Sequence, residues 1–178
     1  MTISRLSRFV TCASLLTAAV LVAAPAAAQM SAPAKLQTAL ANDAGTLSDK
    51  FTGLAKAMAG KYDWKPGQGV RSVGDVFNLI VAENKMLTAV ITGGAPPARP
   101  APMTEPAQVQ EALTSSYAAL KTALGGLSDA DLAAKVKIFG MDSTKQGAAM
   151  MLLSDQHEHL GQSIAYARSN GVVPPWSK

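Results

Sequence analysis

Four segments of the chain carry apolar residues at helical spacing. In three of them the stripes are formed by Leu36, Leu40, Leu47, Phe51, Leu54 and Met58, by Val73, Val76, Phe77, Ile80, Asn84, Leu87 and Ile91, and by Val109, Leu113, Tyr117, Leu120 and Leu124. The fourth segment, from Gln146 to about Ser169, is apolar on more than one side. Steps of three and four residues place such stripes on one face of a helix. The pattern predicts four helices, near residues 33–59, 72–92, 105–125 and 144–170, and therefore an all-α four-helix bundle.

Residues typical of helix ends support these boundaries. Ser72–Asp75 and Ser143–Gln146 have the spacing of capping boxes, in which two side chains satisfy free N–H groups at a helix start. Ser128–Asp131 predicts the start of a short extra helix that runs through Val136. Gly125-Gly126 and Gly171 are expected to end the third and fourth long helices.

The two longest connections are rich in proline and glycine. Lys61–Arg71 contains Pro66, Gly67 and Gly69 and reads as a loop. Gly93–Met103 is proline-rich and cannot continue a helix. Its length predicts a long crossover between helices two and three, which are then not tight antiparallel neighbours. No alternating strand pattern stands out, and we expect no regular structure within Gly93–Met103.

The N-terminal residues predict export. Arg5 and Arg8 are followed by an apolar run from about Phe9 to Ala24 and by a small-residue cleavage site that ends at Ala28. This order is that of a secretory signal peptide. The alternative is a membrane anchor, which needs roughly 20 apolar residues, and this run is shorter and ends at a proline. We expect a signal peptide at residues 1–28, a domain at residues 29–178, a secreted or periplasmic location, and no membrane anchor after cleavage.

Composition excludes several classes of function. The chain has a formal charge of +4, and loss of the two signal-peptide arginines leaves +2, which gives no case for nucleic-acid binding. Its one cysteine, Cys12, lies in the predicted signal peptide. The exported domain therefore has no disulfide, no thiolate metal ligand and no cysteine nucleophile.

Several short motifs, taken in order, resemble those of a known family. They are the loop Tyr62-Asp63-Trp64-Lys65-Pro66, Arg71-Ser72 at the start of the second helix, His159-Leu-Gly-Gln162, Tyr166-Ala-Arg168, and Gly171 followed by Pro174-Pro175. Their order and spacing resemble the DinB-like superfamily of four-helix bundles, over nearly all of the chain that follows the signal peptide. The resemblance implies a DinB-like bundle with a long crossover between helices two and three.

The resemblance also implies a place for a metal ion. Members of the family commonly hold a divalent metal through three histidines, one on the second helix and two, four residues apart, on the last. Those positions fall on Leu79, Asp155 and His159. Only His159 keeps a histidine; Asp155 offers an oxygen ligand, and Leu79 offers none. We therefore expect a degenerate metal site, with Leu79 facing Asp155 and His159.

Helix geometry separates the two histidines of the chain. Asp155 and His159 are four residues apart and share a face. His157 and His159 are two apart, so they point about 200° from each other and cannot chelate one ion together. His157 is expected to have a structural or surface role. Glu83, one turn beyond the Leu79 position, could add a ligand, but nothing in the sequence singles it out.

Three roles stay open for the pair Asp155 and His159. It could be an internal polar pair that is hydrogen-bonded to Gln162 and Tyr166, a weak or altered metal site, or a catalytic acid and base. Two ligands leave most of a coordination sphere to water. We therefore expect no resident cofactor and at most weak binding of Zn²⁺ or Ni²⁺, with Leu79→His plus Asp155→His needed for tight binding.

Two functions of different classes follow. The first is an exported DinB-like module that binds a small molecule or a protein partner, a second copy of the chain included. The alternative, implied by the resemblance, is a metal-dependent thiol transferase or isomerase that uses Asp155 and His159 as metal ligands. The low-molecular-weight thiols of those relatives are cytosolic, which counts against that chemistry in an exported protein.

Overall fold

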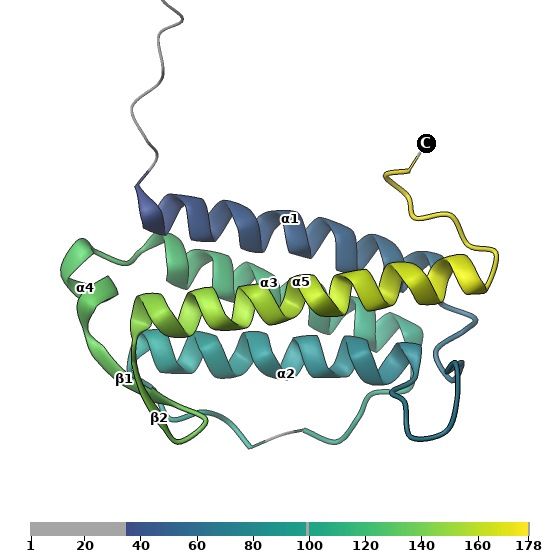
Figure 1. Cartoon of the computed structure of the whole chain (residues 1–178), viewed down its shortest axis with the longest axis horizontal. Coiled ribbons are helices and arrows are strands. Elements are labelled where there is room, and N and C mark those ends of the chain that lie inside the picture. The colour runs from purple at the N-terminus through teal and green to yellow at the C-terminus, as the bar shows by residue number, and fades with distance from the viewer. Residues whose placement is uncertain (1–34, 99, 178) are drawn as a thin grey trace, which may run out of the picture. The chain divides into compact units, whose positions relative to one another are not determined.

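The computed structural model describes residues 35–98 and 100–177, so the predicted signal peptide at residues 1–28 lies outside the described residues. The long helices are α1 (Leu36–Ala57), α2 (Val73–Thr92), α3 (Pro106–Gly125) and α5 (Lys145–Ser169) (Figure 1). Three short elements lie between α3 and α5: helix α4 (Asp129–Ala133), strand β1 (Lys135–Ile138) and strand β2 (Met141–Thr144). All four predicted long helices are confirmed. Among the described helices, none is both long and apolar enough to cross a membrane.

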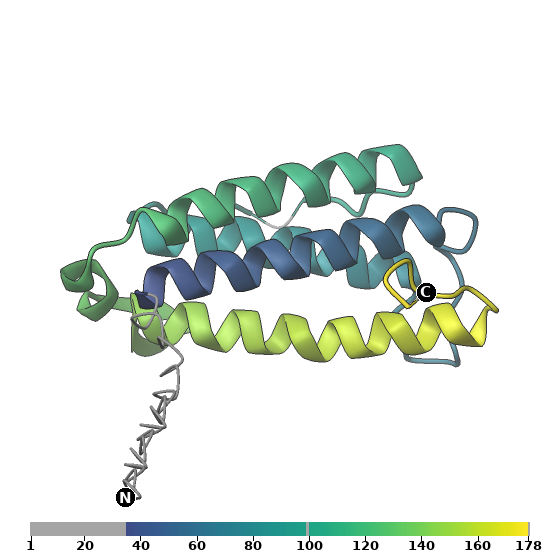
Figure 2. The same cartoon turned by 90° about the horizontal axis from the view of Figure 1, so that it is seen from above.

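The four long helices form the predicted bundle. Both α1 and α2 pack against α3 and α5, so that α1 and α2 occupy opposite corners (Figures 1 and 2). Helices α2 and α3 run in the same direction, and the crossover between them returns along the bundle. This confirms the predicted crossover, and its described residues between Gly94 and Met103 form neither helix nor strand.

The core is filled by the predicted apolar stripes. Its largest fully buried side chains are Tyr117, Phe51, Phe77, Leu47, Leu54, Met58, Ile80, Leu87, Ile91, Leu113, Leu120 and Leu124. Phe51 lies at the centre, with its ring 6.4 Å from that of Phe77 and 6.3 Å from that of Tyr117. These aromatic pairs join α1 to α2 and to α3.

One of the predicted capping boxes is confirmed at α2, and another is wrong at α5. At α2, Ser72 Oγ accepts from Asp75 N at 3.1 Å, and the Asp75 carboxylate accepts from Ser72 N at 3.0 Å. At α5 the capping residue is Thr144, whose Oγ1 accepts from Gly147 N at 3.0 Å, and not Ser143. The helix starts later because β2 continues through Thr144.

A β-hairpin between α4 and α5 was not predicted. Strands β1 and β2 pair antiparallel, and the turn is made by Phe139 and Gly140, with φ of 51° and 77°. Each strand has only four residues, and the turn carries Phe where Asn or Asp is the usual signal. The short helix begins at its Ser128–Asp131 capping box as predicted, but it ends at Ala133 because Val136 belongs to β1.

A buried chain of hydrogen bonds joins three helices. Tyr117 Oη donates to Gln156 Oε1 at 2.9 Å, and Gln156 Nε2 donates to Asn84 Oδ1 at 2.8 Å. Asn84 Nδ2 in turn donates to Ser116 Oγ at 3.2 Å. All four side chains are buried, so each bond replaces one that water would otherwise make. The chain thereby fixes the rotation of α5 against α2 and α3.

We predict that Tyr117→Phe lowers the free energy of unfolding by about 1–2 kcal/mol, because Gln156 Oε1 is then buried without its donor. Denaturant unfolding of the two proteins measures the difference. Thr114→Ala is the control, since that exposed hydroxyl donates only to Gln110 of its own helix, and its expected effect is within about 0.5 kcal/mol. Equal stability of Tyr117→Phe and the unaltered protein would contradict a stabilising role for the buried chain.

Candidate metal centre

Three potential metal ligands converge between α2 and α5. One ligand atom from each of Glu83, Asp155 and His159 lies within 4.8 Å of the other two. Within the cluster, His159 Nε2 is 3.5 Å from Asp155 Oδ2. The side chain of Asp155 is 43% exposed and that of His159 is 16% exposed, whereas Glu83 is buried. The cluster therefore has a buried side on α2 and an open side on α5.

Glu83 is an acid in a place that penalises its charge. Its Oε2 atom is buried and has no hydrogen-bond partner among the described residues. Burial, the larger cause, and the neighbouring charge of Asp155 raise the pKa of Glu83 to about 8. A carboxylate there needs either a proton or a cation close to it.

A relay of side chains orients His159 for coordination. Its Nδ1 is 2.9 Å from Gln162 Oε1, Gln162 Nε2 donates to Tyr166 Oη at 2.7 Å, and Tyr166 Oη donates to the backbone oxygen of Arg71 at 3.2 Å. Because the Gln162 nitrogen donates to Tyr166, the Gln162 oxygen is left to accept from His159 Nδ1–H. This tautomer leaves a lone pair on Nε2, which lies 3.5 Å from Asp155 Oδ2, as in metal-bound histidines.

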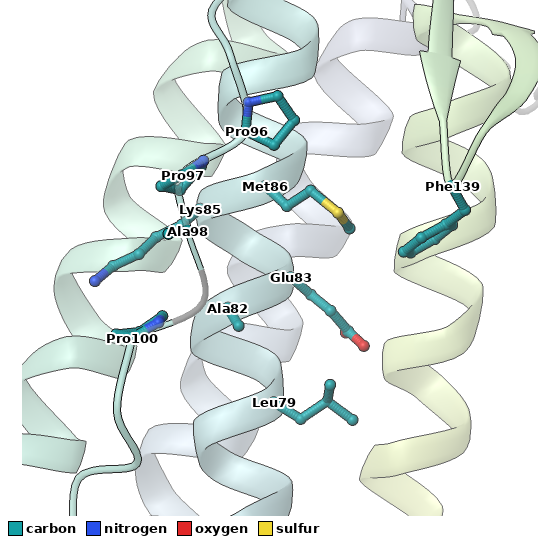
Figure 3. Close-up of a pocket in the computed structure, with 10 residues that line it drawn as sticks. All are labelled: Leu79, Ala82, Glu83, Lys85, Met86, Pro96, Pro97, Ala98, Pro100 and Phe139. Carbon is teal, nitrogen blue, oxygen red and sulfur yellow. The ribbon is translucent and has the colours of Figure 1, made fainter.

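Leu79 occupies the helix-two position where the resemblance implies a histidine. It is half-buried on α2, one turn before Glu83. Figure 3 shows the side chains of Leu79 and Glu83 leaving α2 on the same side, toward α5. The α2 side chain that brings a potential ligand atom close to Asp155 and His159 is therefore Glu83 and not residue 79.

His157 takes no part in the cluster. Its Nε2 is 2.9 Å from Asp43 Oδ1 on α1, and both side chains are substantially exposed. The two histidines thus face different helices, as their spacing predicts. A surface pair of this kind contributes little to stability.

The donor types suit a divalent metal ion. Donors bonded at about 2.1 Å in a tetrahedral arrangement lie roughly 3.4 Å apart. Because the ligand atoms lie within 4.8 Å of one another, binding an ion requires side-chain movements on the order of one ångström. Three protein ligands, one imidazole and two carboxylates, leave coordination positions open for water or a small molecule. Open positions are typical of catalytic rather than structural metal sites.

Glu83 is a possible but unselected ligand in the sequence, although its position carries a signal. Val76, Ile80, Glu83 and Leu87 follow one another at steps of four, three and four residues, so the acid lies within the apolar stripe of α2. Glutamates are almost never fully buried unless they are paired. A single acidic residue within an apolar helix stripe is therefore the signal that could have predicted Glu83 as the third member of the cluster with Asp155 and His159.

Comparisons with known proteins agree with this architecture. The family model described as the DinB superfamily matches residues 46–163. A DinB-like protein from Bacillus subtilis (YjoA) is similar in structure, with a TM-score of 0.62 and 16% identity over 75% of this chain and 92% of its own. A DinB-like protein from Bacillus cereus has a TM-score of 0.61 and 17% identity over 76% and 91%. At these identities the structures show the fold alone, and none of the curated proteins matches the chain.

We predict that the metal-free protein loses stability as the pH rises from about 5 to 8. The folded protein keeps a proton on Glu83 up to a pKa of about 8, whereas the unfolded chain releases it near the ordinary value of 4.5. The folded state therefore binds more protons in this window, and the free energy of unfolding falls with pH. The free energy of unfolding changes by ~1.4 kcal/mol for each pH unit between the unfolded-state and folded-state pKa values. It therefore falls by a few kcal/mol in total.

Denaturant unfolding at several pH values measures this slope. In Glu83→Gln the downward slope should be largely absent, because the amide does not titrate. Glu111→Gln removes an exposed glutamate of α3 and should leave the slope unchanged. A Glu83→Gln protein with the same pH dependence as the unaltered protein would show that the Glu83 carboxyl is not held protonated by its surroundings.

Proposed function

This chain belongs to the DinB superfamily, and from that premise we propose that it is an exported protein that holds one divalent metal ion at Glu83, Asp155 and His159 and presents the ion to a small ligand. The observation that carries the proposal is the buried Oε2 atom of Glu83, which has no hydrogen-bond partner among the described residues. Glu83 lies on α2, whereas Asp155 and His159 lie on α5. Export is supported by the basic, apolar and small-residue pattern of residues 1–28.

A metal ion accounts for Glu83 better than a simple polar pair does. His159 donates from Nδ1 to Gln162 and contacts Asp155 through Nε2, so both of its ring nitrogens have a neighbour without any help from α2. Such a pair has no use for a third, buried carboxyl, whose ionised form is poorly solvated and is repelled by Asp155. A dication between the three side chains removes both penalties at once.

The donor set indicates which metals and ligands suit the centre. Two carboxylates and one imidazole are harder donors than three imidazoles, so they favour ions such as Zn²⁺ or Mn²⁺ with oxygen-donor ligands. A bound ion of this kind supplies Lewis acidity to an oxygen of the ligand. The chain's own part is to orient the His159 ring through Gln162 and Tyr166 and to keep one side of the centre open at Asp155. Softer thiol ligands fit this set less well, which disfavours the thiol transferase or isomerase alternative.

The ligand count revises what the sequence alone implies about affinity. One imidazole and one carboxylate predict weak binding of Zn²⁺ or Ni²⁺. Glu83 raises the number of protein ligands to three, the number found in catalytic zinc sites. We therefore propose stoichiometric binding by the unaltered protein, without the double change at Leu79 and Asp155.

We predict one ion per chain when metal-stripped protein is titrated with Zn²⁺ or Mn²⁺ in a calorimeter at pH 7.5. Glu83→Gln, Asp155→Asn and His159→Gln should each weaken binding by at least about tenfold, since each removes one of three ligands. His157→Gln removes the other histidine of the same helix and should leave affinity unchanged.

Two results would contradict the proposal. Absence of stoichiometric binding by the unaltered protein would mean that the cluster is a polar group only. Equal affinity in the unaltered protein and Glu83→Gln would mean that any ion binds elsewhere, without the ligand from α2.

A further inference from the structure

We propose that the cavity beside the metal centre takes the apolar body of a small molecule whose anionic oxygen head binds the metal. This inference rests on the proposed metal binding and adds the class of ligand. The cavity has a volume of about 240 Å³ and lies on α2, beneath the crossover and the hairpin tip (Figure 3). Its walls are mainly apolar, and its principal lining residues are Leu79, Ala82, Glu83, Met86, Pro96 and Phe139.

The cavity and the metal centre share one residue. Glu83 lines the cavity and is also a member of the cluster with Asp155 and His159. Figure 3 shows its carboxyl group directed toward α5, between the side chains of Leu79 and Met86. A molecule in the cavity therefore has its metal-facing end at Glu83 and apolar walls around the rest.

The wall opposite α2 carries a bulky residue in a strained conformation. Phe139, at the hairpin tip, has a φ of 51° and is 62% exposed. Asn or Gly adopts such a turn position more easily than Phe does. An exposed aromatic ring at the rim of an apolar cavity can pack against a bound ligand.

The crossover is tied to α2 at Met103, just after the residues that line the cavity. Asn78 of α2 donates from Nδ2 to the Met103 oxygen at 2.9 Å and accepts from Met103 N at 2.8 Å. Pro96 and Pro97 restrict the backbone that faces the cavity. The prolines reduce the conformational entropy that this wall loses when a ligand binds.

Size and charge narrow the class of ligand. A cavity of roughly 150 Å³ is enough for benzene, so this one accommodates a ring with a short substituent. A dication is neutralised by the two carboxylates of the centre. Lys85 at the cavity then leaves one positive charge in excess, because Arg71 and Asp75 balance each other in the adjoining hollow. The favoured ligand is a small aromatic or similarly apolar acid.

Benzohydroxamate and acetohydroxamate test this inference, because they carry the same metal-binding head with and without an aromatic ring. With Zn²⁺-loaded protein, we expect calorimetry to show benzohydroxamate binding at least tenfold more tightly. Phe139→Asn, which suits the turn, and Met86→Ala should each reduce this preference several-fold while leaving Zn²⁺ affinity unchanged. Val173→Asn, at a 67% exposed position in the C-terminal segment, is the matched control and should keep the full preference.

The outcomes separate this inference from the proposed function. Zn²⁺ binding with equal affinity for the two hydroxamates, or a preference that survives both cavity variants, would overturn the inference and leave the metal centre standing. No Zn²⁺ binding by the unaltered protein would overturn both.

Discussion

The hydrogen bond from Gln156 to Asn84 is the contact on which the arrangement of the candidate site depends. It joins α5 to α2 inside the core at 2.8 Å, and each partner is the chain neighbour of a candidate ligand, Asp155 on α5 and Glu83 on α2. A helix advances about 100° per residue, so fixing the rotation of these two residues also fixes the direction of their neighbours. The bond thereby keeps Glu83 and the α5 ligands on facing sides.

The four long helices that surround this contact follow from the spacing of apolar residues, and their bounds could be predicted from the sequence. The stripes on α1, α2 and α3 coincide with the buried faces, except for Leu36 at the start of α1, which is exposed. The hairpin could not be read in the same way, because strands of four residues give too short a pattern and the Phe139-Gly140 turn lacks the usual Asn or Asp. Its pairing also moved the start of α5 by one residue, from the predicted Ser143 cap to Thr144.

The candidate site was only partly readable, for a physical reason. Asp155 and His159 are close in sequence, so helical spacing alone places them together. Glu83 meets them only through tertiary packing of α2 on α5, and a single helix pattern does not reveal which residues of two helices face each other. The chain keeps a buried acid there, at a cost to stability, where an apolar residue would pack more favourably. Departures of this kind from core packing are expected at functional sites.

The most direct test of a metal centre built by two helices is the position of the ion itself. Anomalous diffraction from crystals soaked with Mn²⁺ or Zn²⁺ locates it without reference to any activity. The account predicts one strong peak bonded by a Glu83 oxygen, an Asp155 oxygen and His159 Nε2. A peak at the surface pair of His157 and Asp43, or none between α2 and α5, would contradict it.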